Sequence, residues 1–160
     1  PMDLRPLDAP LRPQALALNA GVEAWTSPLD ADALDRLLGV ASFAEAAVED
    51  GRLLGFLVGM TEGSAYWGRN FLWLRERLPR MAYVDRVIVA PEARGRGLAA
   101  ALYARFAAAS GGRPLACEVA TDPPNPGSEA FHARLGFTEL GRAEPWPGHP
   151  AVFLLRAQRP

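Results

Sequence analysis

The sequence predicts a single α/β domain over residues 1–160, with a sheet that is neither wholly parallel nor wholly antiparallel. Two apolar runs are joined by Asp50-Gly51, a dipeptide typical of a tight hairpin turn. A β-branched run at 81–89 then leads into a helical pattern at 97–109. No repeat or low-complexity linker divides the chain, so we expect one domain.

The first half begins with a short predicted strand and two predicted helices, followed by the hairpin. In order, we expect a strand at 4–7, helices near 10–19 and 27–38, and strands at 43–49 and 52–60. Ser27 is the expected N-cap of the second helix, with Pro28 at its first position. The acids at Asp30 and Asp32 would then lie near the positive end of that helix.

The second half is predicted to alternate strands and helices behind an aromatic-rich segment, residues 61–80. We expect a short helix at 70–77, a strand at 81–89, a helix at 97–109, a strand at 115–120, a helix at 126–135, and strands at 137–142 and 151–158. The helix at 97–109 is the clearest, because Leu98, Leu102, Phe106 and Ala109 form one apolar stripe.

The composition excludes several function classes. All 17 basic residues are arginines, so a Walker phosphate loop, a kinase site and Schiff-base chemistry, which need lysine, are ruled out. A net charge of -1 gives no support for a nucleic-acid partner. No apolar run approaches the roughly 20 residues of a membrane span, and the start lacks the apolar core of a secretory signal.

Cysteine and histidine are too scarce for a metal centre. The single Cys117 excludes an intrachain disulfide and fits a reducing compartment, so we expect a cytoplasmic protein. Cys117 falls on the apolar face of its strand, where a thiol is usually inert. His132 and His149, with scattered acids, do not predict a metal site, and His149 is expected at the surface.

The turn between the strand at 81–89 and the helix at 97–109 favours phosphate binding. Gly95 and Gly97 allow the backbone to approach a ligand closely, and the first N–H groups of the helix are unpaired. Arg94 and Arg96 add positive charge, so a pyrophosphate is the natural ligand. The alternative is an ordinary strand-to-helix turn with solvated arginines.

Two segments resemble the GCN5-related N-acetyltransferases. Arg94-x-x-Gly97-x-Ala99 resembles that family's Gln/Arg-x-x-Gly-x-Gly/Ala signature. Residues 125–137 (NPGSEAFHARLGF) resemble its second motif, Asn-x-x-Ser/Ala-x-x-Phe-Tyr-x-x-x-Gly-Phe. The resemblance spans roughly residues 4–158 and implies a mostly antiparallel sheet of about six or seven strands, flanked by about four helices.

The resemblance also implies acetyl-coenzyme A as the acyl donor. Backbone groups of Val87, Ile88 and Val89 would follow its pantetheine arm. The pyrophosphate would lie on Arg94, Gly95, Arg96, Gly97, Leu98 and Ala99. Asn125 and Ser128 would lie beside the pantetheine, although Asn125 is also a suitable N-cap for a helix that begins at Pro126.

Two carboxylates are candidates for the general base that acetyl transfer to an amine requires. Glu118 lies in a Cys-Glu-Val run that resembles the Leu-Glu-Val of some N-terminal-amine acetyltransferases. Its alternative is a solvated strand residue. Asp85 shares a strand face with Val87 and Val89, which would border the thioester. Its alternative is an ion pair with Arg86, Arg75 or Arg80.

His132 stands where the family most often has Tyr, whose phenol is proposed to protonate the thiolate. An imidazole titrates near neutrality and could act as acid, base or hydrogen-bond donor. Its alternative is a helix histidine that is exposed or paired with backbone. Because the residue differs, the role of the Tyr cannot be transferred unchanged.

The aromatic side chains of residues 61–80 have two interpretations. Tyr66, Trp67, Phe71 and Trp73 could line an acceptor pocket or form a lid over it. The alternative is packing, including packing at a homodimer interface.

These observations predict an acetyl-coenzyme A-dependent N-acetyltransferase without a metal. The expected acceptor is a primary amine on a small molecule or a protein N-terminus, and transfer is expected to be direct because the chain offers no activated nucleophile. One alternative is a non-catalytic acyl-coenzyme A sensor on the same fold. The other is a nucleotide-binding protein that uses the turn at residues 94–97.

Overall fold

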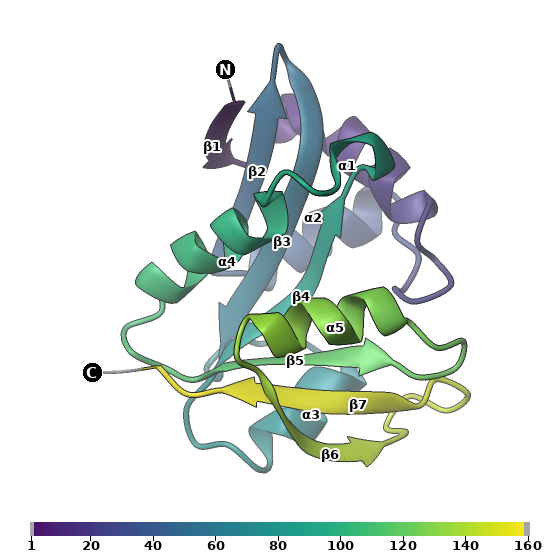
Figure 1. Ribbon diagram of the computed structural model, residues 1–160, viewed down its shortest axis with the longest axis vertical. Helices are drawn as coiled ribbons and strands as arrows, with labels where there is room; N and C mark the ends of the chain where they lie inside the picture. The colour runs from purple at the N-terminus through teal and green to yellow at the C-terminus, as the bar shows by residue number, and fades with distance from the viewer. Residues whose placement is uncertain (1, 159–160) are drawn as a thin grey trace.

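The computed structural model describes residues 2–158 and contains a seven-stranded sheet in the order β1-β2-β3-β4-β5-β7-β6 (Figure 1). Neighbouring strands pair antiparallel, except β4 and β5, which pair parallel. The strands are β1 (Met2–Pro6), β2 (Phe43–Glu49), β3 (Arg52–Thr61), β4 (Ala82–Val89), β5 (Leu115–Ala120), β6 (Thr138–Ala143) and β7 (Ala151–Arg156). The predicted mixed α/β fold is confirmed.

Helices cover both faces of the sheet. The α-helices are α1 (Arg12–Ala20), α2 (Ala31–Val40), α3 (Arg69–Arg75), α4 (Leu98–Ala108) and α5 (Pro126–Arg134), with short 3-10 turns η1 (Ala9–Leu11) and η2 (Pro91–Ala93). Apolar residues of α1, α2 and α3 pack together against one face. Those of α4 and α5 pack against the other, the face toward the viewer in Figure 1.

Local sequence explains most of these boundaries. Asp50 and Gly51 adopt φ of 52° and 74°, the left-handed backbone that the hairpin turn between β2 and β3 requires. The expected start of α2 is wrong. The helix begins at Ala31, and the carboxylate of Asp30 caps it by accepting from the Ala33 N–H at 2.8 Å. Ser27 serves another purpose, because its hydroxyl and carbonyl oxygens both accept hydrogen bonds from Arg86.

Strands β4 and β5 separate soon after they meet. Only Ala82 and Tyr83 of β4 have paired partners on β5, although both strands continue beyond that point. The backbone edges that face each other beyond Tyr83 therefore do not hydrogen-bond, and the sheet forks. Figure 1 shows β4 rising away from β5, with α5 in front of the fork.

A β-bulge changes the direction of the side chains in β4. Val58 of β3 pairs with Arg86 and Gly59 pairs with Val84, so Asp85 is an extra residue without a partner on β3. Adjacent residues of a regular strand point to opposite faces. Here the bulge brings the side chains of Asp85 and Arg86 to the same face, where they pair. The expectation that Asp85 shares a face with Val87 is therefore wrong, because Val87 packs on the opposite side of the sheet.

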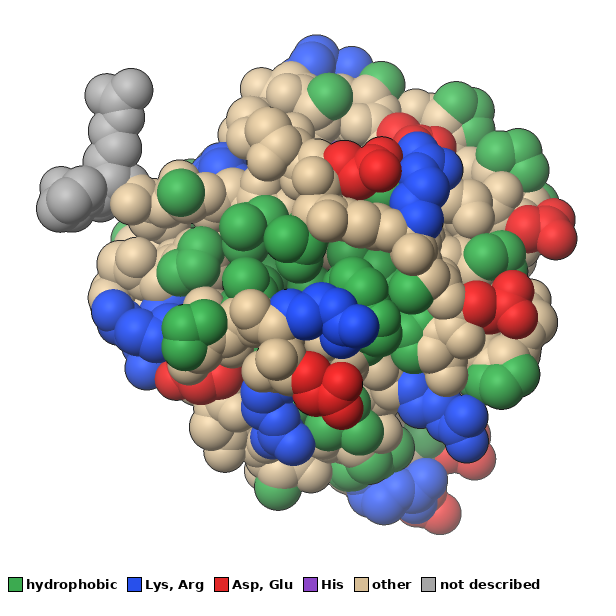
Figure 2. Space-filling model, turned by 90° about the horizontal axis from the view of Figure 1, so that it is seen from below, with side chains coloured by type: hydrophobic (Ala, Val, Ile, Leu, Met, Phe, Trp, Pro, Cys, Tyr) green, Lys and Arg blue, Asp and Glu red, His purple; other side chains and the backbone are tan. Residues whose placement is uncertain are grey.

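The surface carries mixed charges. Because the sequence has no lysine, every blue side chain in Figure 2 is an arginine, and acidic side chains lie between them around a hydrophobic patch. Among the helices of residues 2–158, none is long and apolar enough to cross a membrane.

Candidate active site

The fork between β4 and β5 opens into a cavity of about 1380 Å³. Its walls come from the diverging ends of both strands, from the turn before α4, and from the first residues of α5. The cavity brings together most of the residues that the sequence singled out. These are Tyr66, Trp67, Asp85, Val87, Ile88, Val89, Arg94, Gly95, Gly97, Leu98, Ala99, Glu118, Asn125, Ser128 and His132.

The turn before α4 has the geometry of an anion cradle. Gly95 and Gly97 have φ of 81° and 76°, and a Cβ at either position would meet nothing within 4 Å. The first helical N–H bond of α4 is donated by Ala101 to the Gly97 carbonyl, so the N–H groups ahead of Ala101 remain for a ligand. Arg94 lines the cavity, whereas Arg96 lies outside it and pairs with Glu49 at 2.8 Å.

Glu118 projects from β5 into the fork. The Tyr83 hydroxyl donates to Glu118 Oε1 at 2.7 Å. Burial raises the pKa of Glu118 to about 7, against the hydrogen bond from Tyr83, which lowers it, while the nearby Asp85 raises it further. The carboxylate thus exchanges its proton near neutrality while it faces a large cavity.

Asp85 is held by partners on both of its oxygens. The Tyr66 hydroxyl donates to Oδ1 at 2.7 Å, and Arg86 Nε donates to Oδ2 at 2.8 Å. The side chains of Asp85 and Arg86 are only 5% and 4% exposed. Of the three arginines expected as alternatives, Arg86 is the one that pairs with Asp85.

His132 is buried, and both of its ring nitrogens are engaged. Nδ1 lies 2.7 Å from the Ser128 carbonyl oxygen, which only accepts, so Nδ1 carries the proton. Burial lowers the pKa of His132 and keeps the ring neutral. Nε2 must then accept, and the Tyr103 hydroxyl donates to it at 2.6 Å. The expected alternative of a backbone-paired histidine therefore describes Nδ1.

Asn125 caps α5 and also lines the cavity. Its Oδ1 accepts from the Ser128 N–H at 3.3 Å and so caps α5, which begins at Pro126. The same residue lines the cavity. Ser128 also lines the cavity, and its carbonyl oxygen accepts the hydrogen bond from His132 Nδ1.

Comparison with known proteins assigns the family. A sequence model of the acetyltransferase (GNAT) family matches residues 12–137, most of the chain. The chain belongs to this family. It is an acetyltransferase by that membership, and the resemblance of the two motifs is confirmed. No curated protein sequence matches the chain.

Solved structures share the fold of this GNAT protein at low identity. NAA60 from Arabidopsis thaliana, in complex with a bisubstrate analogue, has a TM-score of 0.76 at 16% identity, with 98% of each chain covered. The ribosomal-protein-S18-alanine N-acetyltransferase from Escherichia coli has a TM-score of 0.72 at 16% identity, covering 100% of this chain and 96% of its own. An N-acetyltransferase from Staphylococcus aureus Mu50 has a TM-score of 0.73 at 18% identity, with 99% of each chain covered.

The four aromatic residues expected at the acceptor side of the acetyltransferase separate into two pairs. Tyr66 and Trp67 line the cavity, and Trp67 is 54% exposed. Phe71 is fully buried in the core, and Trp73 stacks on Phe153 of β7 with ring centroids 4.1 Å apart. Packing accounts for the second pair, and neither of its members lines the cavity. A homodimer stays a prediction.

Several cavity residues of this GNAT protein were not predicted. Tyr83 lies two positions before Asp85, a spacing that could have indicated a shared strand face. Tyr103 follows Leu102 of the apolar stripe of α4, and nothing in the sequence singled it out. Trp146 stacks on His149 with centroids 3.6 Å apart, and both line the cavity. Trp25 donates its indole N–H to the Pro124 carbonyl at 3.2 Å and joins two distant loops at the cavity.

Cys117 is not a candidate nucleophile. Cys117 is buried, and burial raises the pKa of its thiol far above neutrality, which leaves it protonated. Within residues 2–158 no group of three or more His, Cys, Asp or Glu side chains is arranged to hold a metal ion.

Proposed function

We propose that the protein transfers an acetyl group directly from acetyl-coenzyme A to a primary amine of a small molecule or a protein N-terminus. One observation carries the proposal. A single cavity joins an anion cradle at Gly95 and Gly97, the unpaired edge of β4, and an accessible carboxylate at Glu118. NAA60 from Arabidopsis thaliana, which shares this fold, has also been solved in complex with acetyl-CoA.

The cavity fits such a donor in shape and chemistry. The open cradle offers backbone N–H groups and Arg94 to a pyrophosphate. Beyond Tyr83, the β4 edge that faces the fork has no strand partner, so its backbone groups are available to amides of an extended arm. When bound, the donor supplies an acyl group already activated as a thioester.

Glu118 is the proposed general base. An amine enters as an ammonium ion and must lose a proton before it attacks, and a carboxylate with a pKa of about 7 takes that proton near neutral pH. Tyr83 donates to Oε1, and the nearby side chain of Asn70 also lowers the pKa of Glu118. Asp85 is the weaker candidate because Tyr66 and Arg86 hold both of its oxygens.

The other residues of the site would orient the donor and polarise its carbonyl group. A backbone N–H of the segment Val87 to Val89 would donate to the carbonyl oxygen as negative charge develops there. His132 would act through Tyr103, because its own nitrogens are bonded to Ser128 and Tyr103. His132 is thus proposed as a positioning residue, and the Tyr103 hydroxyl as the group that contacts the cavity.

Calorimetry and a thiol-release assay test the proposal. Acetyl-coenzyme A should bind in preference to ATP, and thiol should be released with at least one amine of a panel of amino acids, amino-acid amides, polyamines and peptides. Glu118→Gln should lower kcat by about 10²- to 10⁴-fold while acetyl-coenzyme A still binds. Glu139→Gln, on β6 and outside the cavity, is the matched control.

Each contrary result has a distinct meaning. Preference for ATP would support the nucleotide-binding alternative and overturn the proposal. Tight binding of acetyl-coenzyme A without turnover on any amine would support the acyl-coenzyme A sensor. Equal activity of Glu118→Gln and Glu139→Gln would remove Glu118 as the base and leave the transfer itself standing.

A further inference from the structure

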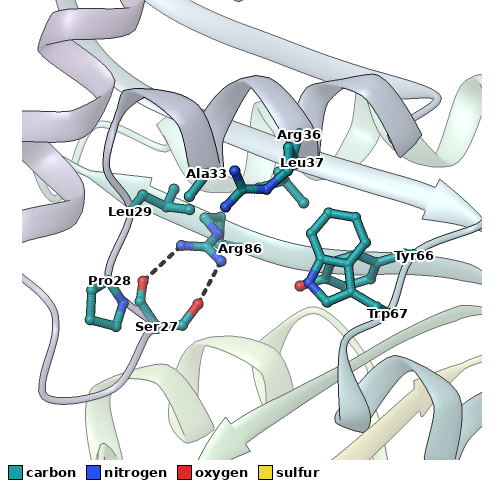
Figure 3. Close-up of a pocket in the computed structure, with 9 residues that line it drawn as sticks. All are labelled: Ser27, Pro28, Leu29, Ala33, Arg36, Leu37, Tyr66, Trp67 and Arg86. Atoms are coloured by element: carbon teal, nitrogen blue, oxygen red, sulfur yellow. Dashed lines mark hydrogen bonds between the residues drawn. The ribbon is translucent and has the colours of Figure 1, made fainter.

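A second, smaller pocket lies directly against the fork cavity. It has a volume of about 130 Å³ and is enclosed by α2, the loop before it, β4 and the segment after β3 (Figure 3). The two spaces share part of their walls: Ser27, Pro28, Tyr66, Trp67 and Arg86 line both. A small molecule at Glu118 could therefore extend one substituent into this pocket.

The floor of the pocket is a buried guanidinium. Arg86 is 6% exposed and uses four of its five N–H hydrogens: one to Asp85, two to Asn19 and the Ser27 carbonyl, and one to the Ser27 hydroxyl. One Nη2 hydrogen is left. Since the Ser27 hydroxyl accepts from Arg86, its own hydrogen is also left, and no described residue accepts it.

A second guanidinium faces the first across the pocket. Figure 3 shows Arg36, from α2, reaching over Arg86. Arg36 forms no ion pair with any residue of the described chain, 2–158, and Asp35 beside it is already paired with Arg12 at 2.8 Å. Asp85 compensates Arg86 from the Nε side. The pocket itself therefore holds excess positive charge and spare hydrogen-bond donors.

We propose that this pocket binds a carboxylate of the acceptor, so that the acceptor is a primary amine that also carries a carboxylate. Two carboxylate oxygens match the donors of Arg36, Arg86 and Ser27, and a guanidinium suits planar, forked oxygens. The inference rests on the proposed acetyl transfer, because it names the substrate class of that reaction. The carboxylate could belong to a free amino acid or to an acidic peptide.

Matched acceptor pairs test the proposal. Free amino acids and their neutral amides, which differ in the carboxylate alone, are compared by kcat/KM in the thiol-release assay. The wild type should prefer the carboxylate member by about tenfold or more, and Arg36→Gln should lose about tenfold of that selectivity. Arg5→Gln, an exposed arginine of β1 that lines neither cavity, removes the same charge and should keep the selectivity.

A second readout probes the pocket directly. Propionate should inhibit the wild type in competition with an amino-acid acceptor, and its inhibition constant should rise about tenfold in Arg36→Gln. Peptides with an acidic first residue, compared with their amide-side-chain counterparts, distinguish the two sources of the carboxylate.

The outcomes separate the two proposals. If amides are acetylated as well as carboxylates and propionate does not compete, this inference is overturned while acetyl transfer stands. If no amine is acetylated, the proposed function fails and this inference fails with it, even though acetyl-coenzyme A binds.

Discussion

The Tyr83 hydroxyl donates a 2.7 Å hydrogen bond to Glu118 Oε1 at the point where β4 and β5 begin to separate. The bond joins the last paired residue of β4 to a carboxylate two positions past the last paired residue of β5. It holds one oxygen of a carboxylate that lines the cavity. Tyr83 thus controls the residue proposed to take the proton.

Tyr83→Phe should move the acidic limb of the pH profile to higher pH. Glu118 must be ionised to act as a base, so kcat/KM should rise with pH through about 7, the pKa that burial sets. The Tyr83 hydrogen bond stabilises the ionised form, and its loss raises that pKa further. The pH dependence of kcat/KM measures the shift. Tyr66→Phe, which removes a donor to Asp85 instead, should leave this limb nearly in place; an equal shift in both variants would contradict the assignment.

Asp85→Asn should destabilise the fold. The substitution leaves Arg86, which is 6% exposed, as a buried charge without its ionic partner, at a cost of about 3–5 kcal/mol in the free energy of unfolding. Urea titration of the variant measures this loss. Asp35→Asn breaks a surface pair with Arg12, in which the aspartate is 60% exposed, and should cost less than about 1 kcal/mol. Similar losses of unfolding free energy in the two variants would show that the buried pair stabilises the fold no more than the surface pair does.

Tyr103→Phe should cost about 1–3 kcal/mol in unfolding free energy, because it leaves His132 Nε2 buried without a donor. In a His132→Phe background the same substitution removes no hydrogen bond to Nε2 and should cost less. A double-mutant cycle measured by denaturant unfolding gives the coupling. A coupling energy of zero would mean that the 2.6 Å contact contributes nothing to stability.

Gly97→Ala should weaken acetyl-coenzyme A binding about tenfold, because a residue with a Cβ is strained at φ 76° and the cradle must change shape to relieve it. The space around the position is open, so the effect comes from backbone conformation. Gly39→Ala is the matched control: it lies inside α2 with nothing within 4 Å and should stabilise the protein by about 0.5–1 kcal/mol. Calorimetry gives the affinities; an unchanged affinity in Gly97→Ala would argue against the cradle.

The fold could be predicted because its elements are encoded locally. The apolar and β-branched runs of the strands, the Asp50-Gly51 turn and the α4 stripe each act within a few residues, and all appear in the structure. The start of α2 failed because Ser27 and Asp30 were both suitable caps. A residue far along the chain, Arg86, takes the oxygens of Ser27 and leaves the cap to Asp30.

Many residues that line the cavity could be named from the sequence, but their arrangement could not. The sequence offered both Glu118 and Asp85 as candidates for the general base. Their difference comes from a bulge that turns Asp85 and Arg86 to one face, and no local pattern announces that bulge. Tyr103 could not be picked out from the sequence either. Its ring belongs to the core, and its hydroxyl, bonded to His132, is the part that belongs to the site.

The fork also leaves few paired residues between the two parts of the sheet. Between β4 and β5 the sheet is joined by two register pairs, whereas β2 and β3 share seven. Strands β1 to β4 and strands β5 to β7 are therefore joined in the sheet at two pairs, while apolar side chains of both parts pack together in the core. A ligand that lies in the fork would make contacts with both strands that they do not make with each other, so its binding should stabilise the folded protein against unfolding.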